Sequence, residues 1–196
     1  MAMMISQRFR LLLLLLLAIP MSGYELLAEP GPQKTGSGSS VTDPQAGHSY
    51  PADTRVHAPG GTASFPIPPG WRGEALEEMA AILLVSEKTA GFVLVFATLN
   101  QTEDDLMALL GEPQPITDSL VFEPVGAVTR QGNRLTASYA AGPLTGRGVA
   151  VIGPAQQGIL FLHGRPQKEQ HEAQALLDQL ANQVQFTPVP GGSLSR

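Results

Sequence analysis

Short apolar runs alternate with turn residues from Thr62 to about Pro188, and this pattern predicts a sheet built from hairpins. Three pairs of runs are joined by only a few polar or glycine-containing residues. Connections this short join antiparallel neighbours, because a parallel crossover needs about a dozen residues or more. We therefore predict three β-hairpins, over 79–99, 119–142 and 148–164.

A helix is predicted between the first two hairpins. Thr102 is a good N-cap, and acidic residues fill positions 103–105 in the first turn, where the helix dipole favours negative charge. Gly111 is well placed to end the helix. The cap and the dipole account for all three carboxylates, so we favour this interpretation over a cation site.

A second helix is predicted near the C-terminus. Its apolar residues recur at the spacing of one helix face, which we expect to pack against the sheet. Pro166 suits the first turn of this helix. The residues of the apolar face are Ala173, Leu176, Leu177, Leu180 and Val184.

The N-terminus has the pattern of a secretory signal peptide, which we assign to residues 1–28. Arg8 and Arg10 precede Leu11–Ile19, an unbroken apolar run of nine residues. This run has the length of a signal-peptide core. It is too short to span a membrane well, which takes about 20 residues.

We expect the signal peptide to be cleaved after Ala28, with sites near Ser22 or Gly23 as alternatives. An uncleaved anchor over residues 11–27 is disfavoured, because Glu25 would then lie in the membrane. The sequence thus predicts an exported protein. We expect the bacterial periplasm rather than the medium, because short exported domains on tethers rich in Pro, Ser and Gly are common there.

The segment that follows the signal peptide differs in composition from the rest of the chain. It is rich in Pro, Gly and Ser and lacks apolar periodicity. Such a segment cannot bury enough surface to offset the entropy lost on ordering. We predict a flexible linker over 29–61, one domain over 62–188 and a disordered tail over 189–196.

The composition excludes several kinds of site and partner. The chain has no cysteine, which rules out disulfides, thiolate metal ligands and cysteine catalysis. Its formal net charge is −5, which argues against nucleic acid or an anionic membrane surface as the main partner. Histidines and carboxylates do not recur at metal-ligand spacing. We predict no metal and no other cofactor.

The two ends of the domain suggest a family. Phe65, Pro69, Gly70 and Trp71 lie near its start, and Leu176–Phe186 forms its end. In these residues the chain resembles the PsbP-like superfamily, which includes Mog-type Ran-binding proteins and DcrB-like envelope proteins. The resemblance implies an α+β fold, with a central antiparallel β-sheet flanked by helices as an α/β/α sandwich. It also implies a binding or assembly role without a shared catalytic motif.

Four residues between the last predicted strand and the last helix are candidates for a ligand site. A strand exit at His163, a turn at Gly164 and a helix start at Pro166 account for their order, and we favour this structural interpretation. Binding residues nevertheless concentrate at such junctions. If a ligand site exists, we predict that it uses His163, Arg165 and Arg147, of which Arg147 would bind an anionic group if its side chain is exposed.

Three functional hypotheses follow. The first is an exported, non-catalytic domain that binds another envelope or secreted protein, with Trp71 as the interface residue if its ring is exposed. The alternative is a small-molecule or anion-binding protein that uses the two arginines and the histidine named above. The third is a hydrolase with His163 as the base and Ser86 or Ser138 as the nucleophile, although the chain has no G-x-S-x-G motif.

Overall fold

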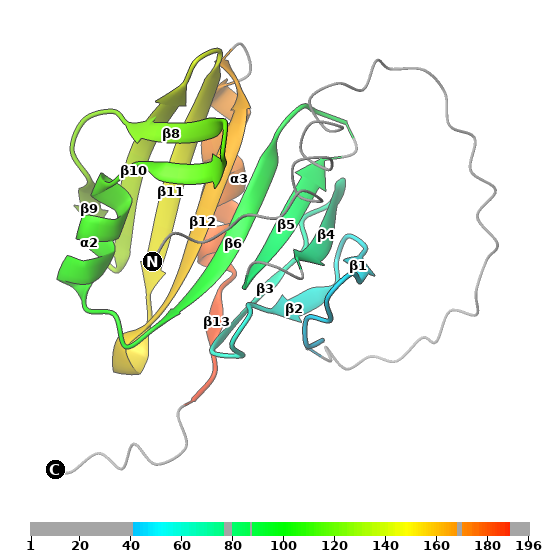
Figure 1. Ribbon diagram of the computed structural model, residues 1–196. Coiled ribbons are helices and arrows are strands. Elements are labelled where there is room, and N and C mark those ends of the chain that lie inside the picture. Colours follow the sequence, from blue (N-terminus) through cyan, green and yellow to red (C-terminus); the bar gives the residue numbers. More distant parts are fainter. Residues whose placement is uncertain (1–40, 77–79, 87, 168–169, 189–196) are drawn as a thin grey trace, which may run out of the picture.

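Ten strands form one antiparallel sheet in the part of the chain that the computed structural model describes, and two helices pack on its opposite faces (Figure 1). The described residues are 41–76, 80–86, 88–167 and 170–188. The predicted signal peptide, the first part of the predicted linker and the predicted tail lie outside them. The predicted α+β class with an antiparallel sheet is confirmed.

The main sheet has the strand order β1-β4-β5-β6-β12-β11-β10-β8-β7, with β9 also paired to β10. Its strands are β1 (Ser49–Tyr50), β4 (Trp71–Leu76), β5 (Ala81–Ser86), β6 (Phe92–Leu99), β7 (Gln114–Thr117), β8 (Leu120–Pro124), β9 (Thr129–Gln131), β10 (Arg134–Ala141), β11 (Leu144–Ile152) and β12 (Gln157–Pro166). A smaller sheet, in the order β13-β3-β2, contains β2 (Arg55–His57), β3 (Ala63–Pro66) and β13 (Gln185–Phe186). The helices are α2 (Glu103–Gly111) and α3 (Gln170–Asn182), and a short 3-10 turn, η1 (Pro154–Gln156), joins β11 to β12.

The three predicted hairpins are confirmed as β5–β6, β9–β10 and β11–β12. The middle one differs in detail from the prediction. Its first arm is divided into β8 and β9, and both pair with β10. The interruption falls at Gly126, whose φ of 82° is incompatible with a continuous strand.

Both faces of the central strands are buried. In β12, Ile159 and Phe161 point to one face, while Leu160 and Leu162 point to the other, because side chains alternate along a strand. The first face is covered by α3 and the small sheet, and the second by α2 and the β7–β8 hairpin (Figure 1). Burial on both faces explains why these strands are continuous apolar runs in the sequence.

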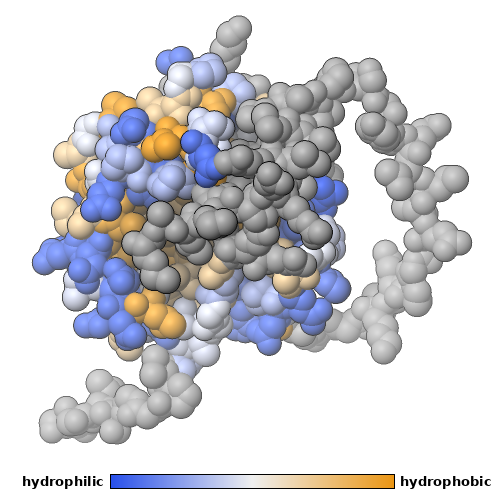
Figure 2. Space-filling model, viewed as in Figure 1, coloured by the Kyte–Doolittle hydropathy of each residue, from blue (hydrophilic) through white to orange (hydrophobic). Residues whose placement is uncertain are grey.

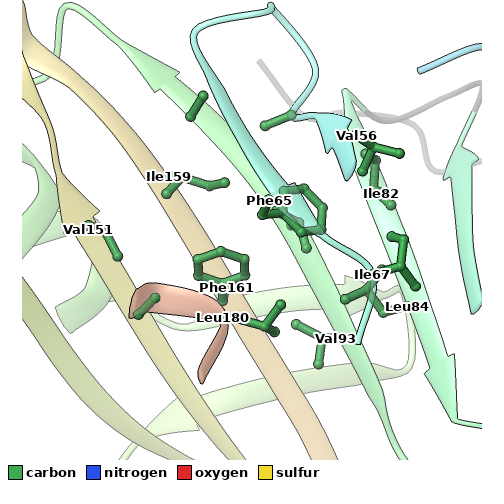
Figure 3. Close-up of a cluster of buried hydrophobic side chains, with 14 of the residues drawn as sticks. Val56, Phe65, Ile67, Ile82, Leu84, Val93, Val151, Ile159, Phe161 and Leu180 are labelled. Atoms are coloured by element: carbon green, nitrogen blue, oxygen red, sulfur yellow. The ribbon is translucent and has the colours of Figure 1, made fainter. Parts of the chain in front are cut away.

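The core between the main sheet and α3 joins segments that are distant in the sequence (Figure 3). Phe65 of β3 meets Phe161 of β12 edge to face, with ring centroids 5.7 Å apart and an interplanar angle of 88°. Such a pair contributes about 0.5–1.5 kcal/mol beyond area burial. Leu177 and Leu180 of α3 are fully buried in the same core, which confirms the apolar face predicted for this helix.

The predicted cap of α2 is confirmed as a capping box. The Asp105 N–H donates to Thr102 Oγ1 at 3.2 Å, and the Thr102 N–H donates to Asp105 Oδ2 at 2.9 Å. Leu106 and Leu110 then face the sheet and are buried. Among the described residues, no helix is long and apolar enough to cross a membrane.

The prediction of a flexible linker is wrong for residues 41–61. β1 pairs with β4, and β2 pairs with β3. Tyr50 and Val56 are buried in the core, and the Gln45 N–H donates to the Tyr50 hydroxyl at 2.7 Å. These strands are only two and three residues long and are flanked by Pro and Gly, so they leave no periodicity in the sequence.

Candidate functional site

A pocket of about 310 Å³ lies where β4 begins and β12 ends. Its walls come from the turn before β4, the turn between β5 and β6, the end of β12, and α3. Odd-numbered residues of β12 point to the face covered by α3, so the pocket continues the surface of the first core. The residues that line it are Pro69, Gly70, Trp71, Ser86, Lys88, Thr89, His163, Arg165 and Leu176.

A type II turn places Trp71 at the pocket. The Trp71 N–H donates to the Pro68 carbonyl at 3.1 Å, and Gly70 has a φ of 77°. Proline at the second position and glycine at the third are the residues that this turn requires. Trp71 then begins β4 directly opposite Ser86 of β5, so both side chains lie on the same face. The indole is half-buried and packs against the core between the main sheet and α3.

The turn after β5 is organised by Ser86. Its Oγ accepts hydrogen bonds from the N–H groups of Lys88 and Thr89, at 3.2 and 3.0 Å, and from the Thr89 hydroxyl at 2.9 Å. These contacts fix the chain at the mouth of the pocket and place the exposed Lys88 there. They also give Ser86 a structural role.

His163 and Arg165 lie within β12, which corrects the predicted turn and helix start. The β11–β12 ladder continues to Pro166, with His163 opposite Arg147 and Pro166 opposite Leu144. His163 and Arg165 are two residues apart in the strand, so their side chains point to the same face. They are 3% and 4% exposed, respectively. The sequence therefore identified pocket residues, although not the backbone that holds them.

Two glycines allow neighbouring atoms to pack closely against the C-terminal end of β12. A Cβ on Gly164 would lie 2.7 Å from Phe92 Cζ and 2.8 Å from Phe122 Cζ, on the face away from the pocket. Gly91, in the β5–β6 turn, has a φ of 144°, and a Cβ there would lie 3.0 Å from the Gly164 carbonyl oxygen and 3.2 Å from Arg165 Cβ. Gly164 is thus required by close packing in a strand, and not by the turn that the sequence suggested.

His163 is neutral at pH 7. Burial, followed by the positive charge of Arg165, lowers the pKa of His163 to about 4. A neutral imidazole has one N–H donor and one acceptor nitrogen. The described lining therefore has two cations, Arg165 and Lys88, a neutral imidazole and no carboxylate.

Arg147, the third residue of the predicted ligand site, lies outside the pocket lining. It is opposite His163 in the β11–β12 ladder, and its Nη1 donates to Oε1 of Gln174 in α3 at 3.3 Å. The structure therefore brings together His163, Arg165 and Trp71, and directs Arg147 to the helix.

The two serines considered as nucleophiles occupy different places. Ser86 lines the pocket with His163, whereas Ser138 is exposed on β10, opposite Arg147, and is not among the lining residues. The described residues contain no group of three His, Cys, Asp or Glu side chains that could hold a metal ion.

The sequence did not single out two of the lining residues, Lys88 and Thr89. Their signal was the polar link of the first hairpin, which indicated a turn but not the strand end beside it in space. Ser86, at the start of the same link, was considered only as a nucleophile. Leu176 was predicted only as a core residue of the last helix.

Comparison with known proteins gives a likeness of fold. Neither a protein-family model nor a curated protein matches the chain. Among solved structures, cyanobacterial PsbP (CyanoP) from Synechocystis is similar at 14% identity, with a TM-score of 0.48, over 82% of this chain and 99% of that one. The Ran-binding protein Mog1p of Saccharomyces cerevisiae is similar at 14% identity, with a TM-score of 0.42, over 67% of this chain and 94% of that one. The chain thus resembles PsbP and Mog1 in fold, as the sequence predicts, and the likeness concerns the fold alone.

Proposed function

We propose that this protein is an exported, non-catalytic binding domain whose pocket at His163 and Arg165 takes an anionic group. One observation carries the proposal: the buried side chains of His163 and Arg165 line a pocket of about 310 Å³ together with the exposed Lys88. A concavity in which a few polar groups converge beside apolar side chains is the typical form of a ligand site.

The charges of the lining favour an anion. Arg165 is almost completely buried, and Lys88 is close to the opening. An interaction between charges is stronger beside low-dielectric protein than in water. Beside these two cations an anionic ligand is favoured over a cationic one.

The exposed apolar residues give less support to a flat protein interface. The large ones among the described residues are spread over several segments of the chain, and Figure 2 shows apolar and hydrophilic residues intermixed on one face. They are Val41, Leu99, Met107, Val121 and Val125. The pocket, which gathers several polar groups in one concavity, is the more typical binding site. The protein partner predicted from the sequence fits this proposal if it presents an acidic group to the pocket.

Binding is tested by titrating 15N-labelled protein, purified from the exported fraction, with sodium acetate, sodium benzoate and sodium phosphate. We expect at least one anion to shift the amide signals of the β5–β6 turn and of the end of β12. Lys88→Gln should weaken this response. Arg72→Gln is the matched control, because Arg72 is exposed on β4 and alternates with Trp71 to the other face. An equal response of Lys88→Gln and the natural protein, or no response to any anion, would contradict the proposal.

Export rests on residues 1–28, and it has its own test. Cell fractionation followed by N-terminal sequencing should find the protein outside the cytoplasm, beginning at Glu29. Recovery of the full-length chain in the membrane fraction would instead favour the uncleaved anchor.

A further inference from the structure

We infer that this pocket binds a small aromatic acid, with its flat ring inside against Trp71 and Leu176 and its acidic group at the opening beside Lys88. The inference rests on the proposed function, because it requires that the pocket take an anionic group. It adds the part of the ligand that fills the pocket and the place where the charge lies.

The interior of the pocket is an extension of the hydrophobic core. Trp71 and Leu176 are half-buried, and both pack against the core between the main sheet and α3. A Cβ on Gly70, beside Trp71, would meet no described atom within 4 Å, so the turn leaves open space next to the indole. A flat apolar ring can stack on the indole and remove water from these surfaces. A bare acetate or phosphate would leave them wet.

The size of the pocket suits a single ring. A dry cavity of about 150 Å³ can hold benzene. The volume of this pocket is about 310 Å³, which leaves room for a short acidic substituent. This value is at the lower end of the range of ligand cavities, which is roughly 300–1,000 Å³. We therefore expect one ring with one acidic group.

The charge of the ligand belongs at the opening. Inside the pocket, His163 is neutral at pH 7, because burial, followed by the charge of Arg165, lowers its pKa to about 4. The buried Arg165 side chain already has an interaction within the protein, so it forms part of the wall. Among the described lining residues, the exposed cation is Lys88. A lysine ammonium is a point charge on a flexible stem and does not select one geometry of acid.

The same lysine opposes an aromatic cation. The face of an indole attracts cations, so Trp71 alone would favour an aromatic ammonium. Lys88 lines the same pocket, and like charges repel. An aromatic acid should therefore bind more tightly than an aromatic amine of the same size.

A small molecule suits the pocket better than an extended polypeptide, which commonly binds through main-chain hydrogen bonds. The N–H groups of Lys88 and Thr89 already donate to Ser86 Oγ. The Trp71 N–H donates to the Pro68 carbonyl. These backbone donors beside the pocket are thus used within the protein.

The test is isothermal titration calorimetry on the purified exported protein, with probes that each change one property. Sodium benzoate is compared with acetate, which lacks the ring, and with cyclohexanecarboxylate, whose ring is not flat. Benzamide and benzylamine change the charge, and benzenesulfonate and phenylphosphonate change the acid. The peptide acetyl-Ala-Ala-Phe, with a free carboxylate, represents the end of a polypeptide.

Three variants are titrated with the same probes. Trp71→Leu keeps an apolar side chain and removes the flat ring. Lys88→Gln removes the charge at the opening. Arg72→Gln is the control, because Arg72 is exposed and alternates with Trp71 to the other face of β4.

We expect benzoate to bind about tenfold more tightly than acetate and about threefold more tightly than cyclohexanecarboxylate, because its ring stacks on the indole. The three aromatic acids should bind within about tenfold of one another, since a lysine does not select their geometry. Benzamide, benzylamine and the peptide should bind more weakly than benzoate.

Trp71→Leu and Lys88→Gln should each weaken the binding of benzoate by about threefold, and Arg72→Gln should not. Nuclear Overhauser contacts between the benzoate ring protons and the Trp71 indole should locate the ring in the natural protein. This measurement decides the position of the ring even if Trp71→Leu does not fold.

Some outcomes would overturn the inference and leave the proposed function intact. These are equal binding of acetate and benzoate, unchanged binding in Trp71→Leu, and ring contacts that do not include the indole. A preference of more than about tenfold for one aromatic acid would overturn the position of the charge at a lysine. Tighter binding of the peptide than of benzoate would point to a polypeptide end instead.

Other outcomes would overturn both the inference and the proposed function. Benzamide or benzylamine that binds as tightly as benzoate would show that the pocket does not select an anion. Unchanged binding of benzoate in Lys88→Gln, or no binding of any anion, would have the same consequence.

Discussion

The ring of Phe122 occupies the space that a side chain on Gly164 would need. Phe122 lies on β8, which crosses over the face of the main sheet opposite α3. Gly146 and Gly164 are direct partners in the β11–β12 ladder, and a Cβ on either would lie within 2.8 Å of a carbon of this ring. The absence of side chains on these two paired glycines thus lets the aromatic ring pack directly on the strands, on the face of the sheet opposite His163.

Gly164→Ala is therefore expected to lower the free energy of unfolding by about 1–3 kcal/mol, because the added methyl overpacks a filled site. Urea denaturation measures the change. Gly111→Ala is the control, since its Cβ would lie 3.9 Å from Val128 Cγ2, which is an ordinary van der Waals contact. Equal stability of Gly164→Ala and the natural protein would show that the ring does not fill this space.

Gly91→Ala should damage the pocket as well as the fold. The substitution imposes a φ that L-residues rarely adopt and places a methyl 3.0 Å from the Gly164 carbonyl oxygen, next to Arg165. We expect a stability loss of about 1–2 kcal/mol and weaker binding of benzoate.

Gly132→Ala is the matched control for that variant. Gly132 has a φ of 61° in the β9–β10 turn, and no atom lies within 4 Å of its Cβ position. This variant should lose stability for the same conformational reason and bind benzoate normally. A loss of binding in both variants would indicate a general effect of destabilisation.

The buried histidine predicts a pH dependence of stability. Burial lowers the pKa of His163 from 6.5 to about 4, so the unfolded chain binds a proton more readily between these values. The stability of the folded state that depends on a neutral His163 is fully present above pH 6.5 and is lost as the pH falls to 4. The pKa difference corresponds to a loss of about 3 kcal/mol in the free energy of unfolding.

His163→Gln should remove this component, so that unfolding free energies measured from pH 6.5 to 4 fall less steeply than those of the natural protein. His48→Gln, at an exposed histidine, is the control and should retain the steep fall. Parallel curves for the natural protein and His163→Gln would mean that His163 titrates normally.

The capping box of α2 gives a prediction far from the pocket. Thr102→Ala should cost about 1 kcal/mol of stability, the usual value for an N-cap threonine. Hydrogen bonds from Thr102 lower the pKa of Asp105, so this pKa should rise in the variant, as NMR titration can measure. Asp104→Asn, in the same turn but outside the box, should leave the pKa of Asp105 nearly unchanged.

The elements that the sequence predicted are those stabilised by residues close to one another in the chain. The hairpins depend on short turns, and the α2 cap depends on two residues three positions apart, so both can be predicted from a single sequence. β1 and β2 were missed because strands of two or three residues show no period, and their stability comes from contacts with β4 and β3.

The pocket was found only in part, because its walls meet through tertiary contacts. Arg165 and Lys88 are far apart in the chain, and no local pattern shows that the β5–β6 turn lies beside the end of β12. The sequence grouped Arg147 with His163, and the ladder places them opposite one another. It could not show that Gln174 of α3 would take the hydrogen bond of Arg147.

The turn that begins β4 has a practical consequence. Trp71 is the only tryptophan in the chain, so all indole emission of the protein arises at the wall of the pocket. A ligand that enters the pocket replaces water around the indole ring and should change the wavelength and the intensity of its fluorescence emission. The unlabelled protein therefore contains its own optical reporter, with which extracts and metabolite collections can be searched for the natural ligand.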